Sequence, residues 1–287
     1  MLVTVDLTGP FRGSDALAAG VLTRGALRGP RFRQLLPDVY APAHLEPSLA
    51  VRSRAASLLV RGSGVVAGYS AAELLGASCG PADAPAEVLM LPGRQRRPRP
   101  DLVVHRDLLL DGECCVRKGV ELTGPVRTAY DLARWAPGLT EKVVAVDALA
   151  HRRFPVDDVR ELARIHLGAY GTSALRTVLQ LADPRSKSPM ETRIRMAVVL
   201  AGLEPPQVQW PVEGGRYRLD LAYPARLLAI EYDGDEHRTQ ARARRDLGRE
   251  AALVRLGWTV LRFDARTVLH DPAEIVRTVH SRLSSRP

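Results

Sequence analysis

The segment at positions 218–237, RLDLAYPARLLAIEYDGDEH, limits the fold of this chain more than any other part of it. Its pattern of apolar and polar residues predicts two strands joined by a proline-containing turn. Side chains alternate between the two faces of a strand, so Glu231 and Asp233 are predicted to share one face. Asp220 lies on the preceding strand. Because buried carboxylates need partners, these acids predict either a divalent-metal site with oxygen ligands or edge-strand acids that face water.

The surrounding C-terminal residues predict a sheet covered by helices. A helix is expected from Ser188-Pro189 to about 201, and a long helix from about 240 to 256, closed by Gly257. The segment WTVLRF at 258–263 is nearly all apolar and predicts a strand buried on both faces. Asp271-Pro272 begins the last predicted helix.

Glu191 allows two interpretations. It stands three residues after Ser188, with Pro189 at the first helical position, and this spacing is typical of a capping box. A glutamate at a helix start can also face the acids of a sheet packed against it. The sequence leaves both interpretations open.

Residues 11–42 predict a helix-turn-helix unit with a wing. Ser14 and Thr23 are expected to cap two short helices, and FRQLLPDVYAP predicts two strands around a Pro-Asp turn. Arginines lie on the second helix and at the start of the wing, where a nucleic-acid reader contacts phosphates. The alternative is a small helical cap with a solvated basic face. The arginines are Arg24, Arg28, Arg31 and Arg33.

Residues 46–182 predict a mixed α+β region. Helices are expected at 49–60 and 70–75, the second with a Ser70 and Glu73 capping box, and strands at 87–91 and 102–106. Helices broken by Pro and Gly follow up to 182, where ADPRSKSP predicts a boundary. The expected domains are therefore 1–45, 46–182 and 186–287.

Composition limits the partners and the compartment. No segment has the roughly 18 apolar residues of a membrane span, and MLVTVDLTGPFRGSD lacks the pattern of a signal peptide. The three cysteines lack zinc-like spacing, and two of them, Cys114 and Cys115, are adjacent, which makes a poor disulfide framework. The sequence therefore predicts a reducing, cytoplasmic location. The net charge of +9 favours a polyanionic partner. The basic residues are almost all arginine, and a GC-rich genome is the alternative explanation of this preference for arginine over lysine.

Several C-terminal motifs occur in a fixed order: Glu191, Asp220, Glu231-x-Asp233-Gly234, His237, Asp246-x-x-Arg249 and GWTVLRF. This order resembles the Vsr-related branch of the PD-(D/E)xK nuclease superfamily. The first 180 residues resemble, through FRGSDALAAGVLTRGALRG and FRQLLPDVYAP, the N-terminal region of AbiEi-type antitoxins, which carry a winged helix.

The resemblance implies a fold class and a site. The expected protein is α+β and multidomain, with a winged helix-turn-helix, a mixed α+β middle region and an α/β/α restriction-endonuclease-like core. Asp220 matches the central metal-binding Asp, and Glu231 matches the acid of the D/E-x-K signature. Asp233 stands where that signature has lysine, so the chain departs from the pattern at this position. His237 is a substitute suited to proton transfer, or else a turn histidine.

A metal at Asp220 and Glu231, Mg²⁺ or Mn²⁺, is the cofactor that follows from the resemblance. Arg245 and Arg249 are candidates for phosphate contacts from the long helix. Alternatively, Asp246 pairs with Arg249 or with an arginine one turn earlier at helical spacing. The sequence indicates no small-molecule cofactor.

The leading hypothesis is a metal-dependent endonuclease that a winged helix positions on duplex DNA. The rival hypothesis is a transcriptional regulator or antitoxin-like protein, with a toxin as a candidate partner, in which the nuclease fold has lost its chemistry. The missing lysine favours the rival, and the acids with His237 favour the nuclease. An RNA-directed nuclease is a third alternative.

Overall fold

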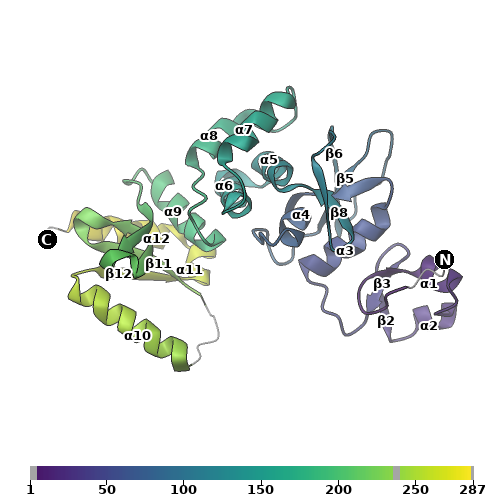
Figure 1. The fold of residues 1–287 in the computed structure, drawn as a ribbon, viewed down its shortest axis with the longest axis horizontal. Helices are drawn as coiled ribbons and strands as arrows, with labels where there is room; N and C mark the ends of the chain where they lie inside the picture. The colour runs from purple at the N-terminus through teal and green to yellow at the C-terminus, as the bar shows by residue number, and fades with distance from the viewer. Residues whose placement is uncertain (1–4, 235–239, 286–287) are drawn as a thin grey trace. The chain divides into compact units, whose positions relative to one another are not determined.

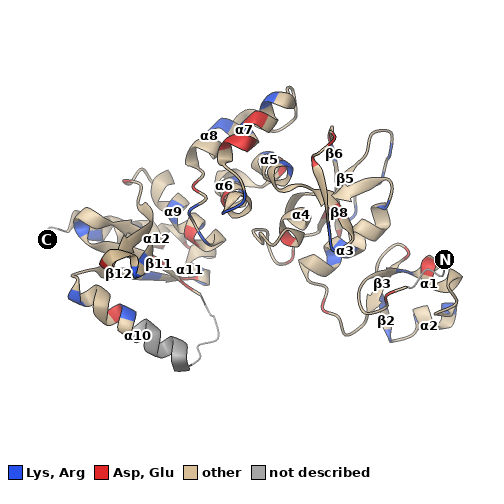
Figure 2. Ribbon diagram, in the orientation of Figure 1, with Lys and Arg blue, Asp and Glu red and all other residues tan. Residues whose placement is uncertain are grey.

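The computed structural model describes residues 5–234 and 240–285, and for residues 240–247 it describes the backbone only. The chain divides into two compact units (Figure 1). The first contains residues 1–136 and 153–180, and the second contains residues 137–152 and 181–287. Both units mix helices with strands, which confirms the predicted α+β class. Figure 2 shows basic positions on elements of both units.

The first unit begins with two short helices beside a three-stranded sheet of order β1-β3-β2. The predicted cap at Thr23 is confirmed, because its side chain accepts a hydrogen bond from the Ala26 amide at 3.2 Å. The predicted cap at Ser14 is wrong. Asp38, in the turn between β2 and β3, accepts instead from the Ser14 amide at 2.8 Å and from its hydroxyl at 2.6 Å. The elements are β1 (Phe11–Arg12), α1 (Gly13–Ala18), α2 (Arg24–Arg28), β2 (Phe32–Leu36) and β3 (Val39–Pro42).

A five-stranded sheet of order β6-β5-β4-β8-β7 forms the rest of the first unit together with its helices. Its strands are β4 (Gly64–Val66), β5 (Ala86–Met90), β6 (Leu102–Arg106), β7 (Cys114–Arg117) and β8 (Val120–Thr123). Its helices are α3 (Leu49–Val60), α4 (Gly68–Leu74), α5 (Pro125–Trp135), α7 (Val156–Ile165), the 3-10 turn Thr172–Ala174 and α8 (Leu175–Leu181). The two predicted strands of this region correspond to β5 and β6, and the first predicted helix to α3.

The predicted capping box of α4 is wrong. The helix begins at Gly68, and the Ser70 hydroxyl accepts a hydrogen bond from the Glu87 backbone amide at 2.9 Å. The Glu87 carboxylate accepts from the Tyr69 amide at 3.1 Å and lies 2.6 Å from the His105 ring. Gly68 has φ of 55°, and a Cβ there would lie 2.2 Å from Glu87 Oε2. Glycine is therefore required for the buried carboxylate to approach the start of the helix.

A buried charge network joins α5 to the segment that follows β6. Arg127 is 1% exposed and donates to Asp131 at 2.9 Å and to Asp107 at 3.1 Å. Its remaining amino group bonds Glu113. Burial raises the pKa of Asp131 to about 6, and the neighbouring arginines oppose that rise.

The second unit is a four-stranded sheet, of order β12-β11-β10-β9, with helices on both faces (Figure 1). β9, β10 and β11 are antiparallel, and β12 runs parallel to β11. Its strands are β9 (Gln207–Val212), β10 (Tyr217–Tyr223), β11 (Leu228–Asp233) and β12 (Thr259–Asp264). Its helices are α6 (Gly138–Ala150), α9 (Pro189–Leu200), the 3-10 turns Glu213–Gly215 and Pro224–Arg226, α10 (Gln240–Arg255), α11 (Ala265–His270) and α12 (Pro272–Ser284).

Helix α6 belongs to this second unit although its neighbours in sequence, α5 and α7, belong to the first. Asp147 on α6 accepts a hydrogen bond from Thr192 Oγ1 at 2.9 Å and from Arg195 at 2.8 Å, both on α9. Asp147 also accepts from the Asp183 amide at 2.6 Å. These bonds are buried or partly buried, so α6 is a structural part of the C-terminal unit.

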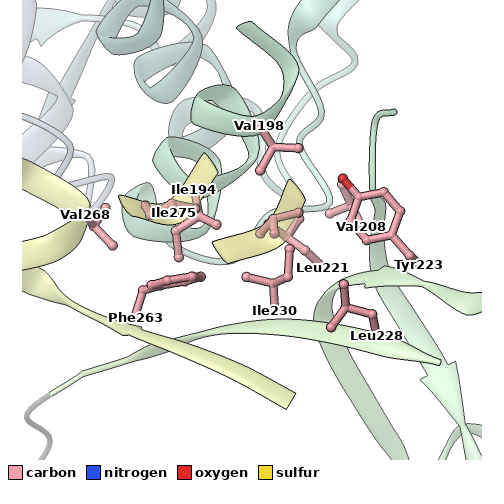
Figure 3. Packing of buried hydrophobic residues seen from close by; sticks show 11 residues of the cluster. Ile194, Val198, Val208, Leu221, Tyr223, Leu228, Ile230, Phe263, Val268 and Ile275 are labelled. Atoms are coloured by element: carbon pink, nitrogen blue, oxygen red, sulfur yellow. The ribbon is translucent and has the colours of Figure 1, made fainter. Parts of the chain in front are cut away.

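The two faces of the sheet bury different clusters. On one face, side chains of β11 such as Ile230 pack against α9, α11 and α12 (Figure 3). On the other face, Ala229 packs with Leu253 of α10 and with Trp258. The alternation predicted for this strand is therefore confirmed. The prediction for residues 258–263 is wrong, because β12 is an edge strand in which Thr259 is exposed while Phe263 is buried.

Within the described residues, no helix has the length and apolar character needed to cross a membrane.

Candidate functional site

A local distortion of the second sheet organises the candidate site. The β9–β10 pairing joins Trp210 to Leu219 and then Val208 to Leu221. Trp210 packs on the α10 face, whereas Val208 packs on the α9 face. Regular alternation would place both on one face, so the strands twist between them, at Gln209 and Asp220. Gln209 has φ of 55°. Left-handed backbone in a non-glycine residue costs about 1–3 kcal/mol and clusters at functional sites.

Glu191 makes both of the contacts that its position in the sequence allows. Its backbone amide donates to Ser188 Oγ at 3.2 Å, which caps α9. Its carboxylate accepts from the Lys187 amide at 3.0 Å and from Gln209 Nε2 at 2.9 Å. Since Glu191 is only 6% exposed, it joins the start of α9 to the distorted part of the sheet.

Asp220 lies beside this contact on β10. Its Oδ1 is 3.4 Å from Gln209 Nε2, and the Tyr232 backbone amide also donates to its carboxylate. Burial, together with the nearby charge of Glu191, raises the pKa of Asp220 to about 6. Strands β9 and β10 and helix α9 thus bring two carboxylates and one side-chain amide together.

Glu231 is buried on β11 and paired with arginine. Arg249 of α10 donates one hydrogen bond to Glu231 Oε2 at 3.1 Å and a second to Oε1. Arg262, its register neighbour on β12, lies 3.8 Å from Oε2. Burial raises the pKa of Glu231, and the hydrogen bonds and charge of Arg249 oppose the rise. The partner of Arg249 is therefore Glu231, and the side chains of Arg245 and Asp246 lie outside the described residues.

Asp233, which the resemblance places at the position of the signature lysine, is the last residue of β11. It is exposed and is the register neighbour of Asp264 on β12. Among the side chains that the structure describes, Arg249 and Arg262 bring positive charge to Glu231. His237 lies outside the described residues.

The N-terminal arginines divide into two groups. Arg24, Arg28 and Arg31 are exposed. Arg33 is partly buried and donates to the carbonyl oxygens of Ala43 at 2.6 Å and Leu45 at 2.9 Å. These bonds hold the chain after β3, so Arg33 has a structural partner in its own unit.

The donor atoms at the site fit a hard divalent cation. Within the described residues, no group of three or more His, Cys, Asp or Glu side chains is close enough to hold a metal ion. The converging atoms are a carboxylate oxygen of Glu191, a carboxylate oxygen of Asp220 and the Nε2 nitrogen of Gln209. Carboxylate oxygens are the donor type that Mg²⁺ and Mn²⁺ prefer. Gln209 Oε1 is buried and has no hydrogen-bond partner in the described part of the chain.

Sequence reasoning does not identify Gln209 or Arg262 as site residues. β9 is absent from the predicted elements, and its Pro211 argues against a strand at this position. β9 is an edge strand, where proline is tolerated. The one signal that could have indicated Gln209 is its position as a polar residue between apolar ones in QVQWPV.

Known proteins resemble both the C-terminal segment and most of the chain. The restriction-endonuclease-like family model REase_MTES_1575 matches residues 191–283, which supports a domain of this type at the C-terminus. Two Mycobacterium tuberculosis proteins, Uncharacterized protein MT2308 of strain CDC 1551 and Uncharacterized protein Rv2248 of strain H37Rv, are similar over a longer span. Each is 30% identical over 239 residues, covering 82% of this chain and 86% of the relative.

Proposed function

This chain belongs to the same family as the two mycobacterial proteins, and we propose that it is a metal-dependent endonuclease that hydrolyses phosphodiester bonds in duplex DNA. The observation that carries the proposal is the convergence of Glu191, Gln209 and Asp220 at the distortion of β9 and β10. Buried acids in contact with a strained residue are costly for stability, and such strain is concentrated at sites of function.

Asp220 and Glu231 hold the cation in this proposal, either Mg²⁺ or Mn²⁺. When bound, the cation supplies Lewis acidity and lowers the pKa of a coordinated water. Glu191 orients Asp220 through the Gln209 amide. Arg262 and Arg249 supply the positive charge that Asp233 cannot, beside Glu231. His237 is the proposed proton-transfer group.

The N-terminal segment directs the nuclease in this proposal. Residues 1–45 are proposed to be a winged helix-turn-helix of the AbiEi-antitoxin type, and residues 186–287 a Vsr-related PD-(D/E)xK core. Arg24 and Arg28 on the exposed side of α2, with Arg31 after it, contact DNA phosphates. Arg33 supports the loop after β3 in place of a phosphate contact. Residues 46–182 join the two, and a toxin is the proposed protein partner.

Nicking of supercoiled plasmid in Mg²⁺ and in Mn²⁺, with EDTA as a blank, tests the proposal. The Asp220→Asn variant keeps the shape of the side chain and removes its charge, so it should lose the activity. Asp157→Asn, on the exposed surface of α7, is the matched control and should cut like the wild type. Equal cutting by wild type and Asp220→Asn would exclude this site as the source of the activity.

A second function is favoured by a specific observation. The guanidinium of Arg249 occupies both oxygens of Glu231, and an acid replaces the signature lysine. These features support a DNA-binding regulator whose nuclease fold serves as a scaffold. Retention of duplex DNA in a gel-shift assay without cleavage in either metal would favour this function over the nuclease.

A further inference from the structure

Gln209 combines a left-handed backbone with a buried, unpaired oxygen, and packing alone does not explain this combination. It is 7% exposed, it lies on an edge strand and its backbone is in the left-handed region. Its Nε2 donates toward Glu191 and Asp220, while its Oε1 has no hydrogen-bond partner among the described residues. An apolar side chain of the same size would fill this space without burying an unpaired oxygen. The side-chain amide of Gln209 is therefore needed for something other than filling space.

The orientation of the amide follows from its neighbours. Both carboxylates are acceptors, so the NH₂ group of Gln209 faces them. A half-turn of the terminal amide exchanges nitrogen and oxygen while the other heavy atoms stay nearly in place. The same movement would bring the unpaired oxygen between the two acids.

One of the two separations at the Gln209 amide equals the spacing of neighbouring ligands around Mg²⁺. Gln209 Nε2 lies 2.9 Å from Glu191 Oε2 and 3.4 Å from Asp220 Oδ1. Two oxygens that each lie about 2.0–2.1 Å from Mg²⁺ in an octahedron are about 2.9 Å apart. Oxygen at the present Nε2 position would therefore stand at that ligand separation from Glu191 Oε2, while Asp220 Oδ1, at 3.4 Å, would have to move closer.

We propose that Gln209 is a divalent-cation ligand, whose amide holds Glu191 and Asp220 together without the cation and turns its oxygen toward the cation when it binds. The inference rests on the proposed function for the cation itself and adds a third residue type to its donor set. A neutral oxygen beside two carboxylates lets the cation bind without adding a third negative charge to a buried site.

Mn²⁺ binding to the full-length chain without DNA tests the inference, with titration calorimetry and electron paramagnetic resonance of unbound Mn²⁺ as readouts. Gln209→Leu removes the donor oxygen and should weaken binding by about 10- to 100-fold. Gln209→Glu keeps an oxygen in place and loses the NH₂ group, so it should bind Mn²⁺ at least as tightly as the wild type. Gln207→Leu, two residues earlier on the exposed side of β9, is the matched control and should bind like the wild type.

The outcomes separate a ligand from a hydrogen-bond donor. If Gln209 acts only by donating to the acids, Gln209→Glu will lose as much affinity as Gln209→Leu, and the inference fails. Wild-type affinity in Gln209→Leu also overturns it; if Asp220→Asn abolishes binding in the same experiment, the cation site and the proposed function stand without Gln209. A wild-type chain that binds no Mn²⁺ overturns the cation site and this inference together. If the Gln209→Leu chain does not fold, Gln209→Met provides the same loss of oxygen with a more adaptable side chain.

Discussion

The pairing of Arg249 with Glu231 predicts competition between a side chain and a cation. A divalent ion that uses Glu231 must displace a guanidinium bound through two hydrogen bonds to a carboxylate that is only 6% exposed. A hydrogen bond to a charged group contributes about 1.5–3 kcal/mol. Because Arg249 is 29% exposed, we count its two bonds together as one such bond. Removing this competitor should then tighten cation binding by roughly 10- to 150-fold, because each 1.4 kcal/mol is a factor of ten. Arg262 remains 3.8 Å away and compensates in part, so the low end, roughly tenfold, is expected.

Arg249→Gln and Arg255→Gln form a matched pair for this test. Both residues lie on α10 and both substitutions remove one positive charge, but Arg255 pairs with the outlying Glu213 at 3.0 Å and is 69% exposed. Mn²⁺ titration of the full-length variants should therefore show tighter binding in Arg249→Gln alone. Without metal, Arg249→Gln should also melt at a lower temperature, because it leaves Glu231 buried with a weaker partner, and Mn²⁺ should restore part of the loss. Equal Mn²⁺ affinity in the two variants would refute the competition.

Three further predictions concern stability in the first unit. Gly68→Ala should destabilise the protein by about 1–3 kcal/mol more than Gly62→Ala in chemical denaturation, since both positions have positive φ but only the Cβ at 68 meets Glu87; equal losses would contradict the reported close approach. The Asp38→Ala variant should lose about 0.5–2 kcal/mol of unfolding free energy, and Asp38→Asn, which keeps an acceptor and tolerates φ of 61°, should lose less. Similar unfolding midpoints for the two variants would show that the bond to the Ser14 amide contributes little to stability. Asp131 has a folded-state pKa raised to about 6 by burial, so the folded chain binds more protons than the unfolded chain between about pH 4 and 6. The stability of the wild type relative to Asp131→Asn should therefore fall as the pH rises through that window, and a rise in urea midpoints would contradict the sign.

Local signals in the sequence predicted local structure well. The helix at 49–60 and the strands on either side of the Pro-containing turn follow from periodicity and turn chemistry, and Thr23 caps α2 through an amide three residues away. The alternation of residues 228–232 also placed Ile230 and Glu231 on opposite faces, because strand geometry requires it.

The sequence was insufficient to predict contacts between residues that lie far apart along the chain. Asp38, 24 residues later, accepts the hydrogen bonds from the Ser14 amide and hydroxyl. The Ser70 hydroxyl accepts from the Glu87 amide of strand β5 and not from its own helix. Whether WTVLRF is central or at an edge depends on strand order, which no residue in the segment encodes. In the candidate site, Arg249 pairs with an acid 18 residues away.

The site also depends on a twist that spacing cannot reveal. Gln209 and Asp220 meet Glu191 only because the side chains of β9 and β10 switch from one face of the sheet to the other between Trp210 and Val208. Each acid was recognised as a candidate from its neighbours in sequence, but the amide that joins two of them was not. The strain at Gln209 is a property of the folded backbone and has no counterpart in composition.

The assignment of α6 to the C-terminal unit has a consequence for how this gene can be divided. A ribosome completes α6 before it makes any other helix or strand of that unit, and α7 and α8 of the other unit follow before α9 appears. The Asp147 carboxylate on α6 therefore has no hydrogen-bond donors from α9 until Thr192 and Arg195 have been synthesised. A single recombination point near residue 186 would transfer a domain that lacks one of its own helices. Exchange of this complete domain between genes would have to include α6. It would then also include residues 153–180, which fold into the other unit.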